Sequence, residues 1–351
     1  MKTYKHLYPA VCEWDNLDLA YRKARLGKRS RPPAAAFEYD LEANLVELRR
    51  ELADKTYRPG RYHSFYIHEP KRRLISAALF RDRVVHHALC NVIEPLFERS
   101  FITDSYANRA GKGTHRAIDR AQQYARRFPY VLQCDVRQFF PSIDHAILRG
   151  LLARKIADQD VMWLVDLILD SGRGVLSEEY EMQWFPGDDL LAALRPRGLP
   201  IGNLTSQFWA NCYLNPFDHF VKRELGCPGY VRYVDDLLLF APDKATLWGW
   251  RRAVVERLAG LRLTIHPGAQ PRPVTEGIPF LGFVVFPDHR RLKRRQGIRY
   301  RRRLKSLLQL YAAGEIGIDR VHASVRGWIN HVRYGDTWRL REAALGPVVV
   351  V

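Results

Sequence analysis

Apolar residues recur at intervals of three and four along several stretches of the chain, which is the spacing that places them on one face of an α-helix. In the first of these stretches the leucines stand at positions 41, 45, 48 and 52. The pattern predicts core helices over four ranges: 40–52, 81–97, 116–127 and 145–170. The second helix contains His86 and His87, which point to different faces and form a poor metal site, so we expect both to be structural.

Runs of β-branched and aromatic residues predict three strand segments, at 130–135, 230–240 and 279–285. The middle run is interrupted by two aspartates and therefore predicts a hairpin. Residues 171–197 contain several glycines and two prolines, which predicts an irregular insertion. A few dispersed strands among many helices indicate the α+β class.

Positive charge changes the picture next, because 56 Lys and Arg against 38 Asp and Glu leave a net charge of +18. Such an excess favours a polyanionic partner, either nucleic acid or an acidic membrane surface. Residues 290–305 contain ten Lys or Arg and no acid. Residues 21–31 are a basic segment that predicts an amphipathic helix leading into a break at Pro32, with a solvated face as the alternative. We expect a basic N-terminal extension over 1–55, a central domain over 56–289 and a helical basic domain over 290–351.

The location of the protein follows from what the chain lacks. Residues 1–16 lack the unbroken apolar core of a signal peptide, and the sequence has no run of about 18 uncharged apolar residues. We therefore expect a soluble cytoplasmic protein with no membrane partner. Its five cysteines are scattered without a C-x-x-C pair, which argues against disulfides and zinc.

The sequence Tyr233-Val234-Asp235-Asp236 presents two carboxylates at the tip of the predicted hairpin. Because successive strand residues face opposite sides, one aspartate should be the principal metal ligand. Asp135, at the end of another predicted strand, supplies a third carboxylate, and Val136 a carbonyl oxygen. Oxygen ligands suit Mg²⁺, and two such ions can promote phosphoryl transfer. The alternative is an Asp-Asp pair that only caps a surface turn.

The order of segments around this hairpin resembles the fingers and palm of bacterial retroelement reverse transcriptases of the group II intron-like type. The matching segments span residues 70–285: 70–75 with 81–85, 105–115, 131–143, 198–207, 230–240, 261–266 and 280–283. The resemblance implies a right-hand polymerase with fingers, palm and thumb. It also implies an RNA-directed DNA polymerase, a nucleotidyltransferase that uses dNTPs and two Mg²⁺ ions.

Residue roles follow from the resemblance by position. Asp135, Asp235 and Asp236 match the metal-binding carboxylates, and Phe140 matches the aromatic steric gate that excludes a ribose 2′-hydroxyl. The alternative for Phe140 is the core, which must hold at least one of Phe139 and Phe140. The cations expected to bind the triphosphate or the template are Lys71, Arg72, Arg73, Arg109 and Lys112, with Arg73 and Arg109 foremost.

The fourth segment, residues 198–207, separates subfamilies. Intron and retron enzymes typically have Gln where this chain has Ile201, whereas the pattern from Ile201 to Gln207 resembles reverse transcriptases of diversity-generating retroelements. An aliphatic side chain cannot hydrogen-bond the incoming nucleotide, so selectivity should fall by roughly ten- to a hundredfold. The alternative is that Ile201 only packs.

That resemblance implies a bacterial or phage-encoded enzyme of mutagenic retrohoming. It copies a template-repeat RNA into cDNA with errors opposite template adenines and works with a pentameric, basic accessory variability protein. The basic stretch after residue 290 falls where a thumb would begin and should bind the template–primer duplex. Its candidate residues are Arg294, Arg295, Arg299, Arg301, Arg302, Arg303 and Lys305, and the alternative is a solvated surface.

Other readings of the chain stay open. It could be a group II intron-type or retron-type reverse transcriptase, although we expect no maturase or endonuclease domain, because the sequence ends soon after the expected thumb. It could also be a catalytically dead RNA-binding scaffold, which the intact acid set disfavours. The sixth segment lacks the usual Lys, so no general acid is assigned, with His266 and Arg272 as the nearby candidates.

Overall fold

The computed structural model describes residues 2–68 and 72–346, and it is a mixture of helices and short strands. The chain divides into two compact units, each assembled from separated segments. Unit 1 comprises residues 1–103, 135–226 and 252–268, and unit 2 comprises residues 104–134, 227–251 and 269–351. The units follow contacts rather than chain order, so the predicted divisions 1–55, 56–289 and 290–351 stay predictions.

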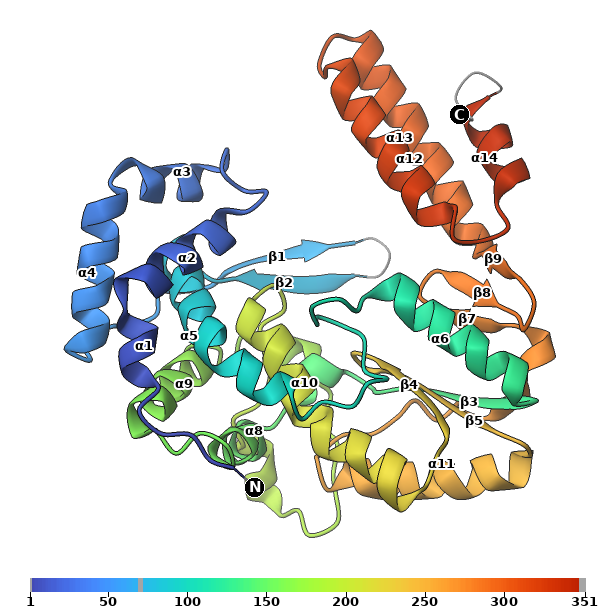
Figure 1. Ribbon diagram of the computed structural model, residues 1–351, viewed down its shortest axis with the longest axis horizontal. Helices are drawn as coiled ribbons and strands as arrows, with labels where there is room; N and C mark the ends of the chain where they lie inside the picture. Colours follow the sequence, from blue (N-terminus) through green and yellow to red (C-terminus); the bar gives the residue numbers. More distant parts are fainter. Residues whose placement is uncertain (1, 69–71, 347–351) are drawn as a thin grey trace. The chain divides into compact units, whose positions relative to one another are not determined.

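Unit 1 is mainly helical (Figure 1). Its long helix α5 is contacted by α2 and by α10, as the apolar stripe of α5 requires. A two-stranded antiparallel hairpin, β1–β2, pairs Ser64 with Ser76. The elements of the unit are α1 (Tyr8–Cys12), α2 (Trp14–Arg25), α3 (Pro32–Tyr39), α4 (Leu41–Ala53), β1 (His63–Ile67), β2 (Arg73–Ala77), α5 (Phe80–Glu98), α7 (Phe139–Ser142), α8 (His145–Ala153), α9 (Gln159–Ser171), η1 (Ser177–Glu179), η2 (Leu190–Leu194), α10 (Leu204–His219) and η3 (Phe220–Glu224).

Unit 2 is built on a four-stranded sheet in the order β4-β5-β3-β6, followed by a three-stranded sheet in the order β7-β8-β9. Helix α6 contacts β4, β5 and β8. The elements are α6 (Thr114–Arg127), β3 (Tyr130–Asp135), β4 (Gly229–Tyr233), β5 (Asp236–Ala241), β6 (Pro271–Pro273), η4 (Val274–Glu276), β7 (Ile278–Phe280), β8 (Phe283–Val285), β9 (Arg290–Leu292), α12 (Arg294–Ala312), α13 (Ile318–Val332) and α14 (Trp338–Leu345). Asp135, the last residue of β3, and the second half of α11 (Lys244–Ala259) are assigned to unit 1.

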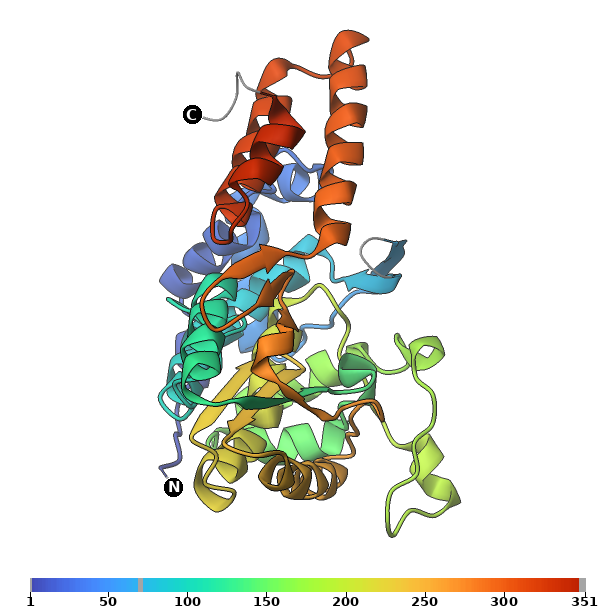
Figure 2. The ribbon, with the colours of Figure 1, turned by 90° about the vertical axis from the view of Figure 1, so that its right-hand side faces the viewer.

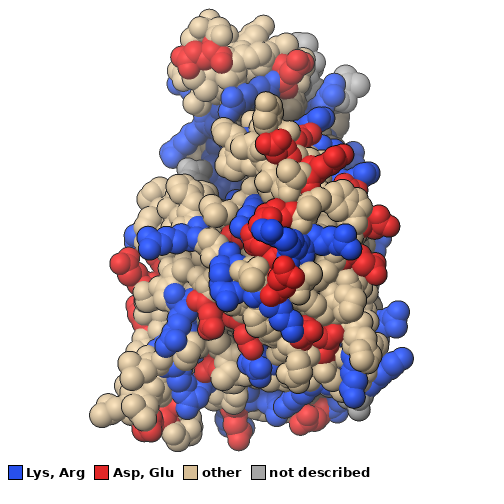
Figure 3. Space-filling model, turned by 90° about the vertical axis from the view of Figure 1, so that its left-hand side faces the viewer, with Lys and Arg blue, Asp and Glu red and all other residues tan. Residues whose placement is uncertain are grey.

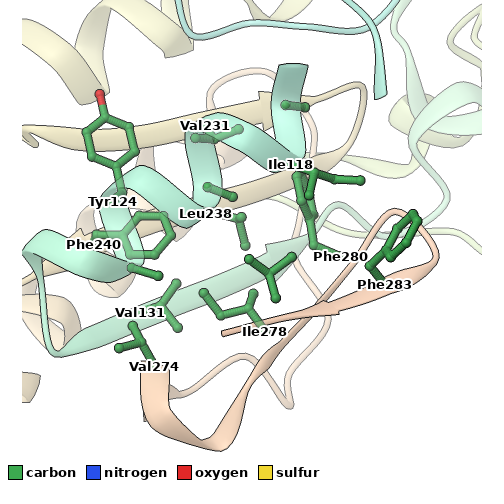
Figure 4. Packing of buried hydrophobic residues seen from close by; sticks show 14 of the residues in the cluster. Ile118, Tyr124, Val131, Val231, Leu238, Phe240, Val274, Ile278, Phe280 and Phe283 are labelled. Atoms are coloured by element: carbon green, nitrogen blue, oxygen red, sulfur yellow. The ribbon is translucent and has the colours of Figure 1, made fainter. Parts of the chain in front are cut away.

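The core of unit 2 fixes the strands that carry the predicted hairpin (Figure 4). Ile118 of α6, Val131 of β3 and Leu238 of β5 lie in one buried cluster, which Phe280 and Phe283 extend. Burial of an aliphatic side chain of this size stabilises a fold by about 1.5–3 kcal/mol, so this packing restrains both hairpin strands.

Most of the predicted elements are confirmed, including the helices at 40–52, 81–97 and 116–127 and the hairpin at 230–240. The range 145–170 is helical as predicted, but it is divided into two helices. The chain forms α8 and α9 there, because the Asp158 carboxylate accepts hydrogen bonds from the amides of Asp160 and Val161 and starts a new helix.

The single strand predicted over 279–285 is wrong. It is a tight hairpin of β7 and β8, since Leu281 and Gly282 adopt φ angles of 46° and 92° and reverse the chain. The insertion at 171–197 is irregular as predicted, with two short 3₁₀-helices and no strand in its described backbone (Figure 2).

The five cysteines are free, as the sequence predicts. Among the described residues, no helix is both long enough and apolar enough to cross a membrane. Basic and acidic side chains alternate over the face shown in Figure 3, so the positive excess is not gathered into one patch there.

Candidate functional site

The predicted hairpin of unit 2 ends in a strained two-residue turn. Tyr233 is paired with Asp236, which leaves Val234 and Asp235 as the turn. Two-residue hairpin turns favour positive φ angles, and Val234 has φ 57°. That region is costly for a β-branched side chain and persists only where surrounding contacts hold it. The turn is therefore fixed by the structure around it.

Two contacts hold the hairpin. The side chain of Arg232 is fully buried, and its Nη1 donates a 3.2 Å hydrogen bond to the carbonyl of Val234. The Tyr233 hydroxyl lies 3.1 Å from the Thr114 hydroxyl at the start of α6. The turn that carries the aspartates is thus tied to α6 and to a buried cation.

A buried carboxylate anchors the segment beside β4. Asp104 is 5% exposed and accepts hydrogen bonds from the Tyr106 hydroxyl at 3.0 Å, the Tyr124 hydroxyl at 2.8 Å and Nε of Arg120 at 3.0 Å. Burial and the bond to this carboxylate raise the pKa of Tyr124 to about 12, so its hydroxyl remains a donor. The backbone on either side of Ser105 bonds Arg232, at 2.9 and 3.0 Å. Asp104 therefore ties α6 to β4.

Sequence reasoning missed Asp104. The available signal was an acid directly before the second matching segment, together with Arg120 and Tyr124 four residues apart on one face of a predicted helix. Their separation from Asp104 by 16 and 20 residues hides the cluster from local patterns.

The loop after Asp104 carries the predicted triphosphate-binding cations of unit 2. Arg109 donates a 2.8 Å hydrogen bond to the carbonyl of Ser105, and the Lys112 ammonium lies 5.1 Å from the centre of the Tyr106 ring. The amide of Gly113 closes the loop with a 2.9 Å bond to the carbonyl of Tyr106. Both cations are thus tethered to the segment that pairs with β4.

Asp135 lies in unit 1 and has a half-exposed side chain. Its backbone carbonyl accepts a 3.0 Å hydrogen bond from the amide of His266, and Val136 is paired with Ile265. The His266 Nε2 atom lies 3.8 Å from a carboxylate oxygen of Asp135. Backbone pairing therefore fixes Asp135 and brings an imidazole near its carboxylate. The Val136 side chain is 2% exposed, and its predicted carbonyl ligation stays a prediction.

The two adjacent phenylalanines differ in burial, and at least one of them lies in the core, as the sequence requires. Phe139 is 2% exposed and belongs to the core, while Phe140 is half-buried with its ring centre 5.4 Å from that of Phe139. The carbonyl of Phe140 accepts a 2.9 Å hydrogen bond from the amide of Leu199. The predicted steric gate is consequently attached to the fourth segment.

The fourth segment in turn joins β2. The carbonyl of Ile201 accepts a 2.8 Å hydrogen bond from the amide of Ser76, three residues after Arg73. Ile201 is half-buried, as is Gln207 in the first turn of α10, and Arg73 is exposed. The structure thus brings the elements that carry Arg73, Phe140, Ile201 and Gln207 together in unit 1.

Two further cations are predicted just before β2 in the sequence. The guanidinium of Arg72 lies over the Tyr66 ring at 3.9 Å. Lys71 lies outside the described residues.

The donor chemistry of the aspartates suits Mg²⁺, which prefers carboxylate oxygens and water. Asp135 belongs to unit 1, whereas Asp235 and Asp236 belong to unit 2. Over residues 2–68 and 72–346, no group of three or more His, Cys, Asp or Glu side chains is arranged to hold a metal ion. The metal assignment stays a prediction.

Helix α12 presents the predicted nucleic-acid-binding residues of unit 2. Six are exposed and Arg299 is half-buried; the exposed ones are Arg294, Arg295, Arg301, Arg302, Arg303 and Lys305. Tyr300 of the same helix stacks on Trp328 of α13, with ring centres 4.1 Å apart. One face of α12 is therefore packed while its basic side chains reach solvent.

The chain is similar in sequence to several known proteins. The chain is 26% identical to protein YkfC of Escherichia coli strain K12 over 297 residues, 73% of each chain. It is 25% identical over 183 residues to the group II intron-encoded protein LtrA of Lactococcus lactis subsp. cremoris, which covers 51% of this chain and 28% of LtrA. It is 28% identical over 97 residues to nuclear intron maturase 1 of Arabidopsis thaliana, of which it covers 14%. The chain thus spans little more than a quarter of LtrA and less of the maturase.

Residues 67–285 match the family model described as reverse transcriptase (RNA-dependent DNA polymerase). This range contains all the predicted metal-binding and nucleotide-binding residues, and only the predicted nucleic-acid-binding residues of α12 lie outside it. The chain therefore belongs to the reverse transcriptase family.

Proposed function

We propose that this protein is the RNA-directed DNA polymerase of a diversity-generating retroelement. It copies a template-repeat RNA into cDNA with errors opposite template adenines. The observation that carries this proposal is Ile201, an aliphatic residue at the position where intron and retron enzymes typically have Gln. Ile201 is half-buried, and its carbonyl is bonded to the amide of Ser76 in β2, the strand that carries Arg73.

The proposed chemistry is transfer of a nucleotidyl group to a primer 3′-hydroxyl. Asp135, Asp235 and Asp236 are assigned as ligands of two Mg²⁺ ions, with the Val136 carbonyl as an additional ligand. When bound, the ions supply Lewis acidity for attack and for departure of pyrophosphate. The strained turn at Val234 supports this role, since such strain clusters at functional sites.

The remaining residues bind and select the nucleotide. Arg73, Arg109 and Lys112 bind triphosphate oxygens through charge-assisted hydrogen bonds. Phe140 excludes a 2′-hydroxyl by steric clash. Ile201 packs where a hydrogen-bonding side chain would otherwise contribute to selection, and Gln207 belongs to the same segment.

Helix α12 is proposed to bind the RNA–cDNA duplex through its exposed cations. Contacts to phosphates release counterions, so binding should weaken steeply with salt. A basic pentameric accessory protein and a cytoplasmic location in a bacterium are further proposals, which rest on the resemblance.

Sequencing of cDNA made by the purified protein tests this function. On an RNA that contains all four bases, substitutions should concentrate at template adenines. Ile201→Gln should lower their frequency by about tenfold, the effect expected for regained hydrogen bonding. Leu204→Gln, the same kind of change at another half-buried position of the segment, is the matched control. An even, low error spectrum in the wild type contradicts the proposal.

The second candidate is a group II intron-type reverse transcriptase, which the similarity to LtrA and to nuclear intron maturase 1 favours. That enzyme class would yield the even spectrum. A catalytically dead scaffold would bind RNA but incorporate no dNTP.

A further inference from the structure

A single buried side chain joins β2 to the fourth segment. Asn203 is 2% exposed and immediately precedes α10. Its Nδ2 donates to the carbonyl of Ser76 at 2.9 Å and to that of Pro200 at 3.1 Å, and its Oδ1 accepts from the amide of Ala78 at 3.1 Å. Both donors and one acceptor position of the amide are therefore used, which leaves the side chain one orientation.

This use of the side chain is unusual for its position. Asn at a helix N-cap commonly bonds an amide of its own helix. The Asn203 side chain makes no such cap bond to α10 and instead reaches a strand more than 120 residues away in sequence. Its contribution is thus to the placement of the loop on β2.

The backbone around Asn203 also lies close against β2. The amide of Ser76 bonds the carbonyl of Ile201 at 2.8 Å. Gly202 has φ 118°, and a Cβ atom there would lie 3.1 Å from Cγ2 of Ile75. Any residue other than glycine would be strained at this φ and would press on Ile75. Three consecutive residues, 201–203, therefore fit against one short stretch of strand.

We propose that Asn203 is a positioning residue for nucleotide selection, which holds Ile201 at a fixed distance from β2 and hence from Arg73. This inference rests on the proposed function, since it deepens the roles given there to Ile201 and Arg73. Asn203 is buried and acts through its neighbours. Small displacements of positioning groups change transition-state binding strongly, so a shift of the loop should alter selection.

Asn203→Asp is the sharpest variant, because it keeps the shape of the side chain. It replaces the donor with an oxygen that faces the carbonyls of Ser76 and Pro200. Asn203→Ala is the second variant, which removes the bonds without adding repulsion.

Ser206→Ala is the matched control. Ser206 is 3% exposed, and its hydroxyl donates a 2.7 Å hydrogen bond to the same carbonyl of Pro200. It belongs to α10, so its bond holds the loop to its own helix, and its removal leaves the bonds to β2 intact. If the role of Asn203 were merely structural, the variants of Asn203 and of Ser206 would change nucleotide incorporation to the same extent.

Two measurements on the purified full chain decide the matter. Steady-state incorporation of single dNTPs should show KM raised about tenfold in the Asn203 variants, with kcat within about threefold and an altered ratio of correct to incorrect nucleotide. In Ser206→Ala, KM, kcat and the ratio of correct to incorrect nucleotide should each stay within about twofold of the wild-type value. Hydrogen exchange should show faster exchange of the Ser76 and Ala78 amides in the Asn203 variants only.

The outcomes separate the two proposals. Unchanged exchange of both amides in the Asn203 variants overturns the positioning role whatever the enzyme does. Faster exchange with unchanged KM and selectivity also overturns it. A wild-type protein that incorporates no dNTP overturns both the proposed function and the selection role that depends on it, whereas an active wild type with unaltered variants overturns only the role of Asn203.

Discussion

The two units hold their candidate residues in physically different ways. In unit 1, neutral groups fix the fourth segment to β2, through the Asn203 amide and the bond between Ser76 and Ile201. In unit 2, a buried carboxylate, Asp104, fixes the loop beside β4, and the turn next to it is strained at Val234. The first arrangement depends on hydrogen-bond geometry and the second on charge held out of water, so the units should respond to different perturbations.

Buried titratable groups add a second comparison. In unit 1, His86 is 1% exposed, and burial lowers its pKa to about 3. In unit 2, the Asp104 carboxylate accepts hydrogen bonds from Tyr106, Arg120 and Tyr124. His86 is thus a buried base that stays neutral, whereas Asp104 is a buried acid with partners. Unit 1 buries such an acid too, Asp82, which accepts a 2.7 Å hydrogen bond from the Tyr57 hydroxyl.

The largest expected effect tests whether both units contribute to catalysis. Asp135→Asn in unit 1 and Asp236→Asn in unit 2 should each lower single-turnover primer extension by about a thousandfold, roughly 4 kcal/mol of barrier. Asp243→Asn is the control, because Asp243 is an exposed residue that bonds Thr246 at the start of α11. If primer extension falls by less than about tenfold in either Asp135→Asn or Asp236→Asn, the assignment of both residues as metal ligands is contradicted.

The next effect concerns the buried carboxylate of unit 2. Asp104→Ala should lower the free energy of unfolding by about 3 kcal/mol, since Arg120, Tyr106 and Tyr124 lose their acceptor. Tyr106→Phe, which removes one donor and keeps the ring, should cost about 1 kcal/mol. Urea denaturation measures both. Equal losses for the two variants would contradict the central place of Asp104.

Acid should act on unit 1 through His86. Its folded-state pKa of about 3 lies below the unfolded value, so the unfolded state binds the additional proton. The stabilisation of the folded state that comes from neutral His86 is fully present above about pH 6.5. It is lost by about 1.4 kcal/mol per pH unit as the pH falls toward 3. Urea titrations at several pH values give the free energy of unfolding as a function of pH. The slope of this dependence should be smaller by the equivalent of one proton in His86→Leu than in the wild type. His87 supplies part of the remaining slope, because burial lowers its pKa to about 4. Identical slopes would show that His86 is not buried in its neutral form.

The smallest effect comes from the strained turn. Val234→Gly removes the backbone strain of a β-branched residue in the left-handed region, which stabilises the folded state by about 1–2 kcal/mol. The greater conformational freedom of glycine in the unfolded chain destabilises the folded state by about 0.5–1 kcal/mol. The free energy of unfolding should rise by at most about 1.5 kcal/mol, while incorporation falls because Asp235 is held less firmly. A destabilised variant with full activity would contradict a functional reason for the strain.

The sequence predicts those features that depend on local pattern. Alternation and apolar runs locate the hairpin of Asp235 and Asp236, and the order of segments identifies the family that the comparisons confirm. The spacing of Phe139 and Phe140 also predicts correctly that at least one of them is core.

The features that were missed depend on partners distant in the chain. Asp104 bonds Arg120 and Tyr124 of α6, 16 and 20 residues away, and Asn203 bonds Ser76 of β2 and Ala78 just after it, 127 and 125 residues away. The positive φ of Val234 has no sequence signal, because β-branched residues avoid it and tertiary contacts impose it. Local propensity could not predict any of the three.

The most direct test of the central claim is incorporation of dNTPs on an RNA template with a DNA primer, by wild type and by Asp235→Asn, with binding of the same duplex measured in parallel. We predict Mg²⁺-dependent extension by the wild type, abolished by chelation, and a variant that binds the duplex but does not extend it. Undiminished extension by Asp235→Asn, or none by the wild type, would contradict the account.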